Sequence, residues 1–167
     1  MAEDAQKSNG SARPISFWGW PALVSLVVFI LDQLTKLYFC NNFEVGSGVN
    51  VIPNFFNLVH YRNTGGAWGM LGNYTWILGL ISLAAFVGFI IVFKKQNKGN
   101  RLVAASFAVL IGGIAGNMVD RIFRGSVVDF LDFFISDCHW PAFNVADSAI
   151  CVSMVALIVL LSFQKDK

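Results

Sequence analysis

The sequence predicts an all-α integral membrane protein, with four transmembrane helices and a small β-rich platform loop on the outer side. First, 56% of the 167 residues are hydrophobic, 13% are charged and the mean hydropathy is +0.61. Soluble domains carry about 25% charged residues. Second, the apolar residues gather in four long runs. Third, most basic residues lie before the first run, between the second and third runs or after the fourth, which places them on one side of a membrane.

Each apolar run is long enough to cross about 30 Å of hydrocarbon. The four runs span residues of about 17–39, 74–93, 102–119 and 144–163. The first is too long for the apolar region of a signal peptide, and no small-x-small cleavage site follows it. Residues 1–13 are polar and small, which is typical of a disordered tail. We therefore expect a cytoplasmic tail, 1–13, and one membrane domain, 14–167.

The basic residues predict the orientation, because cytoplasmic loops carry an excess of Lys and Arg. Most of them precede the first run, separate the second from the third, or follow the fourth: Lys7, Arg13, Lys94, Lys95, Lys98, Arg101, Lys165 and Lys167. The other two loops contain only Arg62, Arg121 and Arg124. Both termini should therefore be cytoplasmic, and loops 40–73 and 120–143 should face outward.

The first outer loop has the composition of strands. Between residues 49 and 61 it is rich in valine, phenylalanine and tyrosine, punctuated by asparagine and proline. We predict a small β-rich platform on the outer membrane surface.

Several classes of function and site are disfavoured. A net charge of +2 without a basic stripe does not suit nucleic acid. Cys138-His139 is an isolated dipeptide and a weak metal motif, so we expect no metal and no cofactor. Cys40 and Cys138 both fall in outward segments, which leaves a disulfide between them open.

The acidic residues cluster. Five of the ten Asp and Glu lie in one stretch near the outer ends of the third and fourth spans: Asp120, Asp129, Asp132, Asp137 and Asp147. Carboxylates near the membrane are costly unless they are paired or hydrogen-bonded. The cluster therefore suggests a functional site.

Each member of the cluster also has a local structural interpretation. Asp129 lies between apolar neighbours, and Asp132 shares its face only if the segment is helical. An amphipathic interfacial helix with solvated acids would explain both residues. Asn144 suits a helix N-cap, and Asp147 three residues later could complete a capping box. The functional interpretation makes Asp147 a catalytic carboxylate at the edge of the bilayer.

The end of the third span combines small and polar residues. Gly112 and Gly116 form a small-xxx-small pair that lets a neighbouring backbone approach closely. Gly113, Asn117 and the Asp120-Arg121 pair share one helix face. Either this face makes a tight helix contact with a satisfied polar end, or it holds an extended substrate backbone.

Two further features are polar. Asp32 and Lys36 are four residues apart within the first span and can form an ion pair. We favour a structural pair that anchors the outer end of the first span and orients the platform loop, and that could also touch a substrate headgroup. Around Asn63 and Gly65 the loop is either a plain turn or a flexible clamp, in which the Asn63 amide donates to and accepts from a peptide.

Five short motifs thus follow one another along the chain: Asp32-Gln33-Leu34-Thr35-Lys36, Asn63-Thr64-Gly65, Gly116-Asn117-Met118-Val119-Asp120-Arg121, Val127-Val128-Asp129-Phe130 and Asn144-Val145-Ala146-Asp147. Each motif alone is weak. In this order, on a four-span topology, they resemble the lipoprotein signal peptidase family (signal peptidase II, the prolipoprotein signal peptidases). The match covers nearly the whole chain beyond the N-terminal tail.

The resemblance implies an aspartic endopeptidase of the bacterial inner membrane with its active site near the periplasmic face. Its catalytic pair would be Asp129 and Asp147. The residues expected to contact or orient substrate are Asn63, Gly65, Asn117, Asp120, Arg121, Val127, Asn144 and Ala146. The substrate would be a diacylglyceryl-modified prolipoprotein, cut just before the lipidated cysteine. Membrane lipids and globomycin-type inhibitors are the other implied partners, and we expect a monomer.

This chemistry suits a pair of close carboxylates, which share one proton because both cannot ionise cheaply. Two rival functions remain open at this point. A small transporter could use Asp32 and Lys36 as a proton or ion relay, and a non-enzymatic scaffold could use the glycine faces alone. A serine or cysteine peptidase is disfavoured, because neither His60 nor His139 lies in a nucleophile motif.

Overall fold

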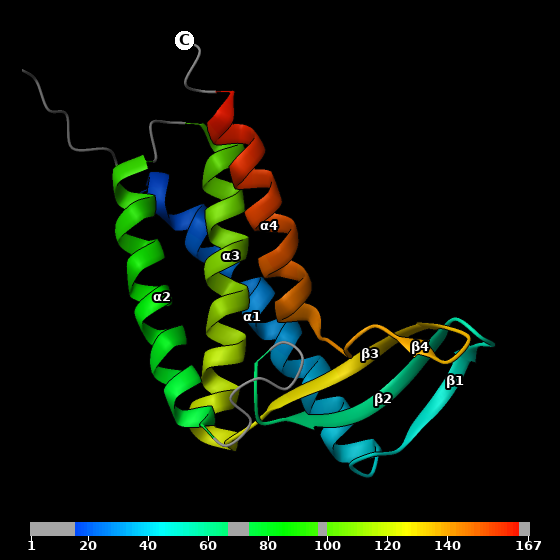
Figure 1. The fold of residues 1–167 in the computed structure, drawn as a ribbon. Helices are drawn as coiled ribbons and strands as arrows, with labels where there is room; N and C mark the ends of the chain where they lie inside the picture. The colour runs from blue at the N-terminus through cyan, green and yellow to red at the C-terminus, as the bar shows by residue number, and fades with distance from the viewer. Residues whose placement is uncertain (1–15, 67–73, 97–99, 164–167) are drawn as a thin grey trace, which may run out of the picture.

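The computed structural model describes residues 16–66, 74–96 and 100–163, so the predicted tail 1–13 lies outside the described residues. Four helices in the described part are long and apolar enough to cross a membrane. They are α1 (Ser16–Asn42), α2 (Thr75–Gln96), α3 (Arg101–Val119) and α4 (Val145–Ser162). Together with a small antiparallel sheet, they confirm the predicted fold class (Figure 1).

α3 is the central and most buried helix, and the other three pack against it. Glycine permits the close contacts. A Cβ atom on Gly112 would lie 2.6 Å from the Ser25 carbonyl oxygen of α1, and one on Gly113 would lie 2.7 Å from the Ala146 oxygen of α4. The close approach predicted from the small residues of this span is therefore confirmed.

The sheet has the order β1-β2-β3-β4, with every neighbour antiparallel. The strands are β1 (Gly48–Ile52), β2 (Phe56–Asn63), β3 (Val127–Ile135) and β4 (Cys138–His139). The sheet projects sideways from one end of the helix bundle, away from the end where α2 stops and α3 begins (Figure 1). The strands predicted between 49 and 61 are confirmed.

Residues 127–135 form the strand β3, so the amphipathic-helix interpretation of this segment is wrong. The segment is rich in β-branched and aromatic residues, which suit a pleated, half-buried surface. As a strand, it directs Asp129 and Asp132 to opposite faces of the sheet.

A π-helical turn, η2 (Asp120–Arg124), extends α3 toward the sheet. It ends at Gly125, whose φ of 68° is left-handed and therefore favours glycine. The backbone N–H of Val128 then donates to the Asp120 carboxylate at 3.2 Å. This contact holds the start of β3 against the end of α3.

Aromatic packing fixes the sheet on the bundle. The ring of Phe39, near the end of α1, stacks on that of Phe130 in β3, with centroids 4.5 Å apart. Cys40 follows Phe39 and makes no disulfide with Cys138, since all three cysteines are free. The strand that carries Asp129 is thus held by packing rather than by a covalent link.

Candidate active site

A cavity of about 550 Å³ lies between β3, the first half of α4 and the segment that joins β4 to α4. Both predicted catalytic carboxylates line it. Its wall is polar beside the carboxylates and apolar elsewhere: Asn63, Gly66, Arg121, Val127, Asp129, Trp140, Pro141, Ala142, Phe143, Asp147, Ser148, Cys151 and Val152. The cavity can therefore receive a polar group and an apolar chain side by side.

β3 positions Asp129, whose residue surface is only 4% exposed. Its Oδ1 accepts a hydrogen bond from Asn144 Nδ2 at 2.7 Å, and its Oδ2 accepts one from Asn63 Nδ2 at 3.1 Å. Burial, followed by the nearby charge of Asp147, raises the pKa of Asp129 to about 7, although both amide bonds act in the opposite direction. This carboxyl therefore exchanges its proton near neutral pH.

The first turn of α4 positions Asp147 as part of a complete capping box with Asn144. The Asp147 N–H donates to Asn144 Oδ1 at 3.0 Å, and the Asn144 N–H donates to Asp147 Oδ2 at 3.3 Å. From α3, Asn117 Nδ2 donates to Asp147 Oδ1 at 2.7 Å. The capping interpretation is thus confirmed, and the same carboxylate also lines the cavity.

Three asparagine amides that face the carboxylates are oriented by their own oxygens. Asn63 Oδ1 accepts from the Gly65 N–H at 2.9 Å, and Asn117 Oδ1 accepts from Lys36 Nζ at 2.9 Å. Asn144 Oδ1 accepts from the Asp147 N–H. An N–H or ammonium group can only donate, so each amide must turn its NH₂ toward a carboxylate. The donors around the two aspartates are therefore preorganised.

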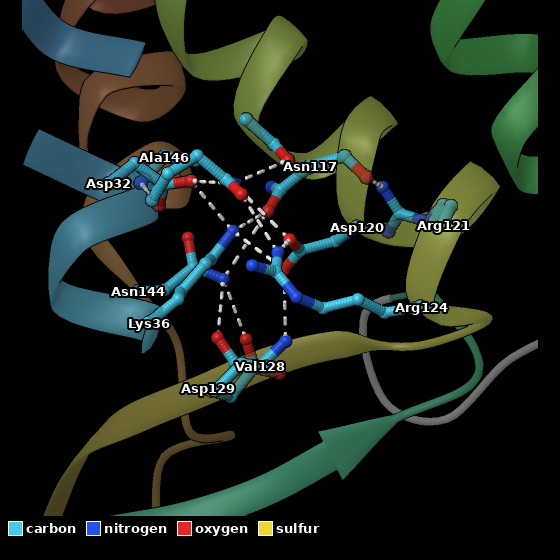
Figure 2. Close-up of polar contacts among 12 residues, drawn as sticks. Asp32, Lys36, Asn117, Asp120, Arg121, Arg124, Val128, Asp129, Asn144 and Ala146 are labelled. Carbon is cyan, nitrogen blue, oxygen red and sulfur yellow. Dashed lines mark hydrogen bonds and ion pairs between the residues drawn. The ribbon is translucent and has the colours of Figure 1, made fainter. Parts of the chain in front are cut away.

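Lys36 lies at the centre of a buried ion network behind these amides (Figure 2). Its ammonium is 2.9 Å from Asp32 Oδ2 and 3.1 Å from Asp120 Oδ2, and all three side chains are fully buried. Asp32 Oδ1 accepts from the Ala146 N–H at 2.9 Å, which ties α1 to the first turn of α4. Neither the Asp32 nor the Lys36 side chain reaches the surface, so this structure supports the structural role of the pair and shows no exposed atom of either that could touch a substrate headgroup.

Two members of the network were not anticipated from the sequence. Arg124 pairs with Asp120 and donates to Gln33 Oε1 at 2.8 Å. Gln33 Nε2 in turn contacts Asp32, Asp120 and the Gly116 carbonyl. The i,i+4 spacing of Asp120 and Arg124 could have indicated their pairing, whereas nothing local distinguishes Gln33 from a surface glutamine.

The residues predicted to contact or orient substrate fall into two groups, one lining the cavity and one outside its lining. Asn63, Arg121 and Val127 line the cavity with the two aspartates. Five others lie outside its lining: Gly65, Asn117, Asp120, Asn144 and Ala146. These five residues form hydrogen bonds with the carboxylates, with the amides or with the ion network. The apolar wall of Trp140, Phe143 and Val152 was not anticipated, since apolar residues near a span carry no distinctive pattern.

Arg121 is incompletely satisfied. Its Nη1 is 3.5 Å from both Ser82 Oγ of α2 and the Asn117 carbonyl oxygen, at the outer limit of a hydrogen bond. Its Nε is buried without a hydrogen-bond partner in the described part of the chain. The cavity therefore holds a cation with spare donors beside two carboxylates.

Sequence comparison with known proteins shows which family this chain resembles. The family model described as signal peptidase (SPase) II matches residues 24–163. A lipoprotein signal peptidase of Bacillus velezensis (strain DSM 23117 / BGSC 10A6 / LMG 26770 / FZB42) is 37% identical over 145 residues, which cover 87% of this chain and 95% of the relative. That of Bacillus subtilis (strain 168) is 34% identical over 145 residues, covering 87% and 94%.

Two solved structures of bacterial membrane enzymes share the fold of this chain. One bacterial membrane enzyme, solved by the in meso method at 2.3 Å resolution, matches with a TM-score of 0.81 and 32% identity, over 89% of this chain and 91% of that one. Another, solved at 1.9 Å, matches with a TM-score of 0.77 and 33% identity, over 87% and 94%. The resemblance drawn from the five motifs is confirmed, and the chain belongs to the signal peptidase II family.

Proposed function

We propose that this chain cleaves the signal peptide from diacylglyceryl-modified prolipoproteins, just before the lipidated cysteine, with Asp129 and Asp147 as its catalytic pair. The family and the names of its relatives support the substrate class. The single observation that supports the catalytic pair is that both carboxylates line one cavity, each held by asparagine donors.

The two carboxylates act as one titrating unit. The charge of Asp147 raises the pKa of Asp129, so the pair retains one proton near neutral pH. The ionised member takes a proton from a water molecule, whose oxygen attacks the scissile carbonyl carbon. The protonated member donates to the carbonyl oxygen, and a proton then passes to the leaving amine as the C–N bond breaks.

The cavity wall suggests how substrate binds. Trp140, Phe143 and Val152 offer an apolar surface to the lipid chains or the signal peptide. Asn63, Val127 and Arg121 line the cavity with the two aspartates, and we assign them to the part of the substrate around the reacting carbonyl. A buried unpaired donor costs free energy until an acceptor arrives. Arg121 lines the cavity and its guanidinium is incompletely hydrogen-bonded, so we assign this side chain to a substrate carbonyl oxygen.

The remaining predicted residues act indirectly. Asn117, Asn144 and Gly65 orient the donors around the carboxylates, whereas Asp120 and Ala146 anchor β3 and α4 to the ion network. Asp32 and Lys36 serve as the structural ion pair of that network.

We further propose that the protein spans the bacterial inner membrane with both termini in the cytoplasm and its active site near the periplasmic face. Lys94 and Lys95 lie in the last turn of α2, and Arg101 begins α3. The end of α2 and the start of α3 lie at the end of the bundle opposite the sheet (Figure 1), as the positive-inside rule requires of a cytoplasmic loop. The protein is expected to act as a monomer and to be inhibited by globomycin-type compounds.

A gel-shift cleavage assay in detergent tests the catalytic proposal. The substrate is a diacylglyceryl-modified prolipoprotein, and the proteins are wild type, Asp129→Asn, Asp147→Asn and a control, Asp137→Asn. Asp137 lies in the exposed β3–β4 turn, outside the cavity. We expect wild type and Asp137→Asn to cleave, and both catalytic variants to lose activity by at least about 10³-fold while still showing a cooperative thermal unfolding transition.

Three controls complete the assay. Cleavage should persist with a chelator, stop with globomycin and require the lipid modification of the substrate. Wild-type rates from either folded catalytic variant would falsify the assignment of the pair. Absence of cleavage by folded wild type would instead favour the transporter or scaffold function.

A further inference from the structure

A second cavity, of about 570 Å³, lies between α1, α2 and α3 and shares no lining residue with the catalytic cavity. It arises because α1 and α2 each pack on α3 and scarcely on each other along their described lengths. Small residues form its floor, among them Ala22 of α1 and Ala115 of α3, while Phe29 and Ile90 form its sides. It is a groove open to the membrane, and the function proposed above does not use it.

The groove has the length of one lipid chain. It follows α3 from Ala108 to Val119, which is about 16 Å at the rise of an α-helix. That is about half of the hydrocarbon thickness of a bilayer, and so about one leaflet. An empty apolar groove would forfeit dispersion contacts along its walls, and an acyl chain supplies them without burying a polar group.

The lining of the groove favours a lipid occupant. Ser25 and Lys94 are the only polar residues among the described residues that line it. An acyl chain can therefore fill the groove through apolar contacts, and Lys94 offers a charge to the headgroup.

One end of the groove carries a charge. Lys94 lines it near the start of α3, at the level where the ring of Phe93 lies 5.6 Å from that of Phe107. Lys94 is exposed, and no acidic side chain in the described part of the chain pairs with it. A cation at the end of an apolar groove can pair with the anionic headgroup of a lipid whose acyl chain lies in the groove. The adjacent Lys95 is equally exposed but does not line the groove.

We propose that this groove is a binding site for one membrane phospholipid with an anionic headgroup, whose acyl chain lies between α1 and α2 and whose phosphate pairs with Lys94. The proposal goes beyond the peptidase function and does not depend on it. Because α2 also places Ser82 beside Arg121, a bound lipid would stabilise the helix that supports one wall of the catalytic cavity.

Native mass spectrometry of the detergent-purified protein tests the site. Phosphatidylglycerol and phosphatidylcholine with identical acyl chains are added separately. Wild type should retain one phosphatidylglycerol with about fivefold preference, the ratio expected for one basic side chain near the membrane surface. Lys94→Gln should abolish this preference and Lys94→Glu should reverse it. The matched control, Lys95→Gln, should bind as wild type does.

A second variant tests the apolar part. Ala115→Trp fills the groove and should displace both lipids, and its thermal unfolding temperature shows whether it is folded. If Ala115→Trp fails to fold, the three lysine variants decide the question alone, since they leave the groove volume unchanged. Equal retention of the two lipids by wild type, an equal loss of preference in Lys95→Gln, or a lipid-sensitive dimer in place of bound lipid would each overturn the proposal.

Discussion

At the scale of single residues, the site depends on what surrounds two carboxyl groups. Asp129 is buried, lies near the charge of Asp147 and has a pKa of about 7. Asp132, three residues along the same strand, instead faces Asn57 and His139, at 2.9 Å and 2.8 Å. Two aspartates of one short segment therefore take different roles because a strand turns them to opposite faces.

Activity should fall in alkaline solution. The mechanism requires the pair to hold one proton, and the pKa of Asp129 is about 7. As pH rises above about 7 this proton is lost, so kcat/KM should decline tenfold per pH unit on the alkaline side. Initial rates between pH 5 and 9 would measure this limb. A profile that stays flat to pH 9 would contradict a shared proton.

The same shift predicts how stability depends on pH. The pKa of Asp129 is raised from an ordinary 3.8 to about 7, so between these values the folded protein binds more protons than the unfolded chain. Its contribution to the free energy of unfolding is therefore present at low pH and is lost as pH rises toward 7. At about 1.4 kcal/mol per pKa unit, the loss is about 4 kcal/mol. Thermal unfolding should show a flatter pH dependence for Asp129→Asn than for wild type.

Asn117 offers a test of the donor arrangement. Asn117→Asp keeps an oxygen for Lys36 but removes the N–H that Asp147 accepts. A hydrogen bond to a charged group contributes about 1.5–3 kcal/mol, so kcat should fall about 10- to 100-fold, with a smaller change in KM. Asn42→Asp, at the exposed end of α1, is the control and should cleave normally. Equal kinetics for the two variants would exclude this role.

At the scale of elements, close helix contacts set the position of the catalytic residues. Gly113 allows α3 to touch the first turn of α4 at Ala146, one residue before Asp147. β3 is held from two sides, by β2 and by the Asp120 contact to Val128. The two aspartates therefore meet only where α3, α4 and β3 converge.

A pair of glycine substitutions tests this convergence. Gly113→Ala would place a Cβ 2.7 Å from the Ala146 carbonyl oxygen, whereas Gly88→Ala on α2 meets nothing within 4 Å. The first should displace the start of α4 and lower kcat at least about tenfold, since misplaced catalytic groups lose rate steeply. The second should be neutral or slightly stabilising, because alanine favours helices over glycine. Equal activity of the two variants would show that the contact does not position Asp147.

At the scale of the whole molecule, one buried ion network joins the helices to each other and to the sheet. Lys36 of α1 reaches Asn117 and Asp120, Asp32 reaches the start of α4, and Asp120 reaches β3. A buried charge is tolerable only when it is paired and hydrogen-bonded. The network therefore links the stability of the fold to the geometry of the site.

Lys36→Met should be the most destabilising substitution in the network. It leaves Asp32 and Asp120 buried without their shared cation, although Arg124 still pairs with Asp120. Removing one partner of a buried pair costs about 3–5 kcal/mol. Thermal unfolding in detergent should show the loss, with Lys95→Met, an exposed lysine on α2, as control. A wild-type unfolding temperature would mean that the network adds nothing to stability.

The sequence by itself determined the spans, the strands of the first outer loop and the identity of the polar motifs. These features depend on local patterns, namely long apolar runs, β-branched and aromatic segments, and capping spacing. The sequence left undecided whether residues 127–135 form a helix or a strand. The reason is that this segment becomes a strand by pairing with β2, which lies more than 60 residues earlier in the chain.

Only the tertiary structure decided which polar residues face the cavity and which lie behind it. Lys36 and Asn117 are 81 residues apart, and their contact, together with a longer one from Asn144, turns the Asn117 amide toward Asp147. Gln33 joins the network and Trp140 the cavity wall without any local pattern that marks them. The physical reason is that burial and hydrogen-bond partners are set by packing between distant segments, whereas sequence periodicity reports only on neighbours within one element.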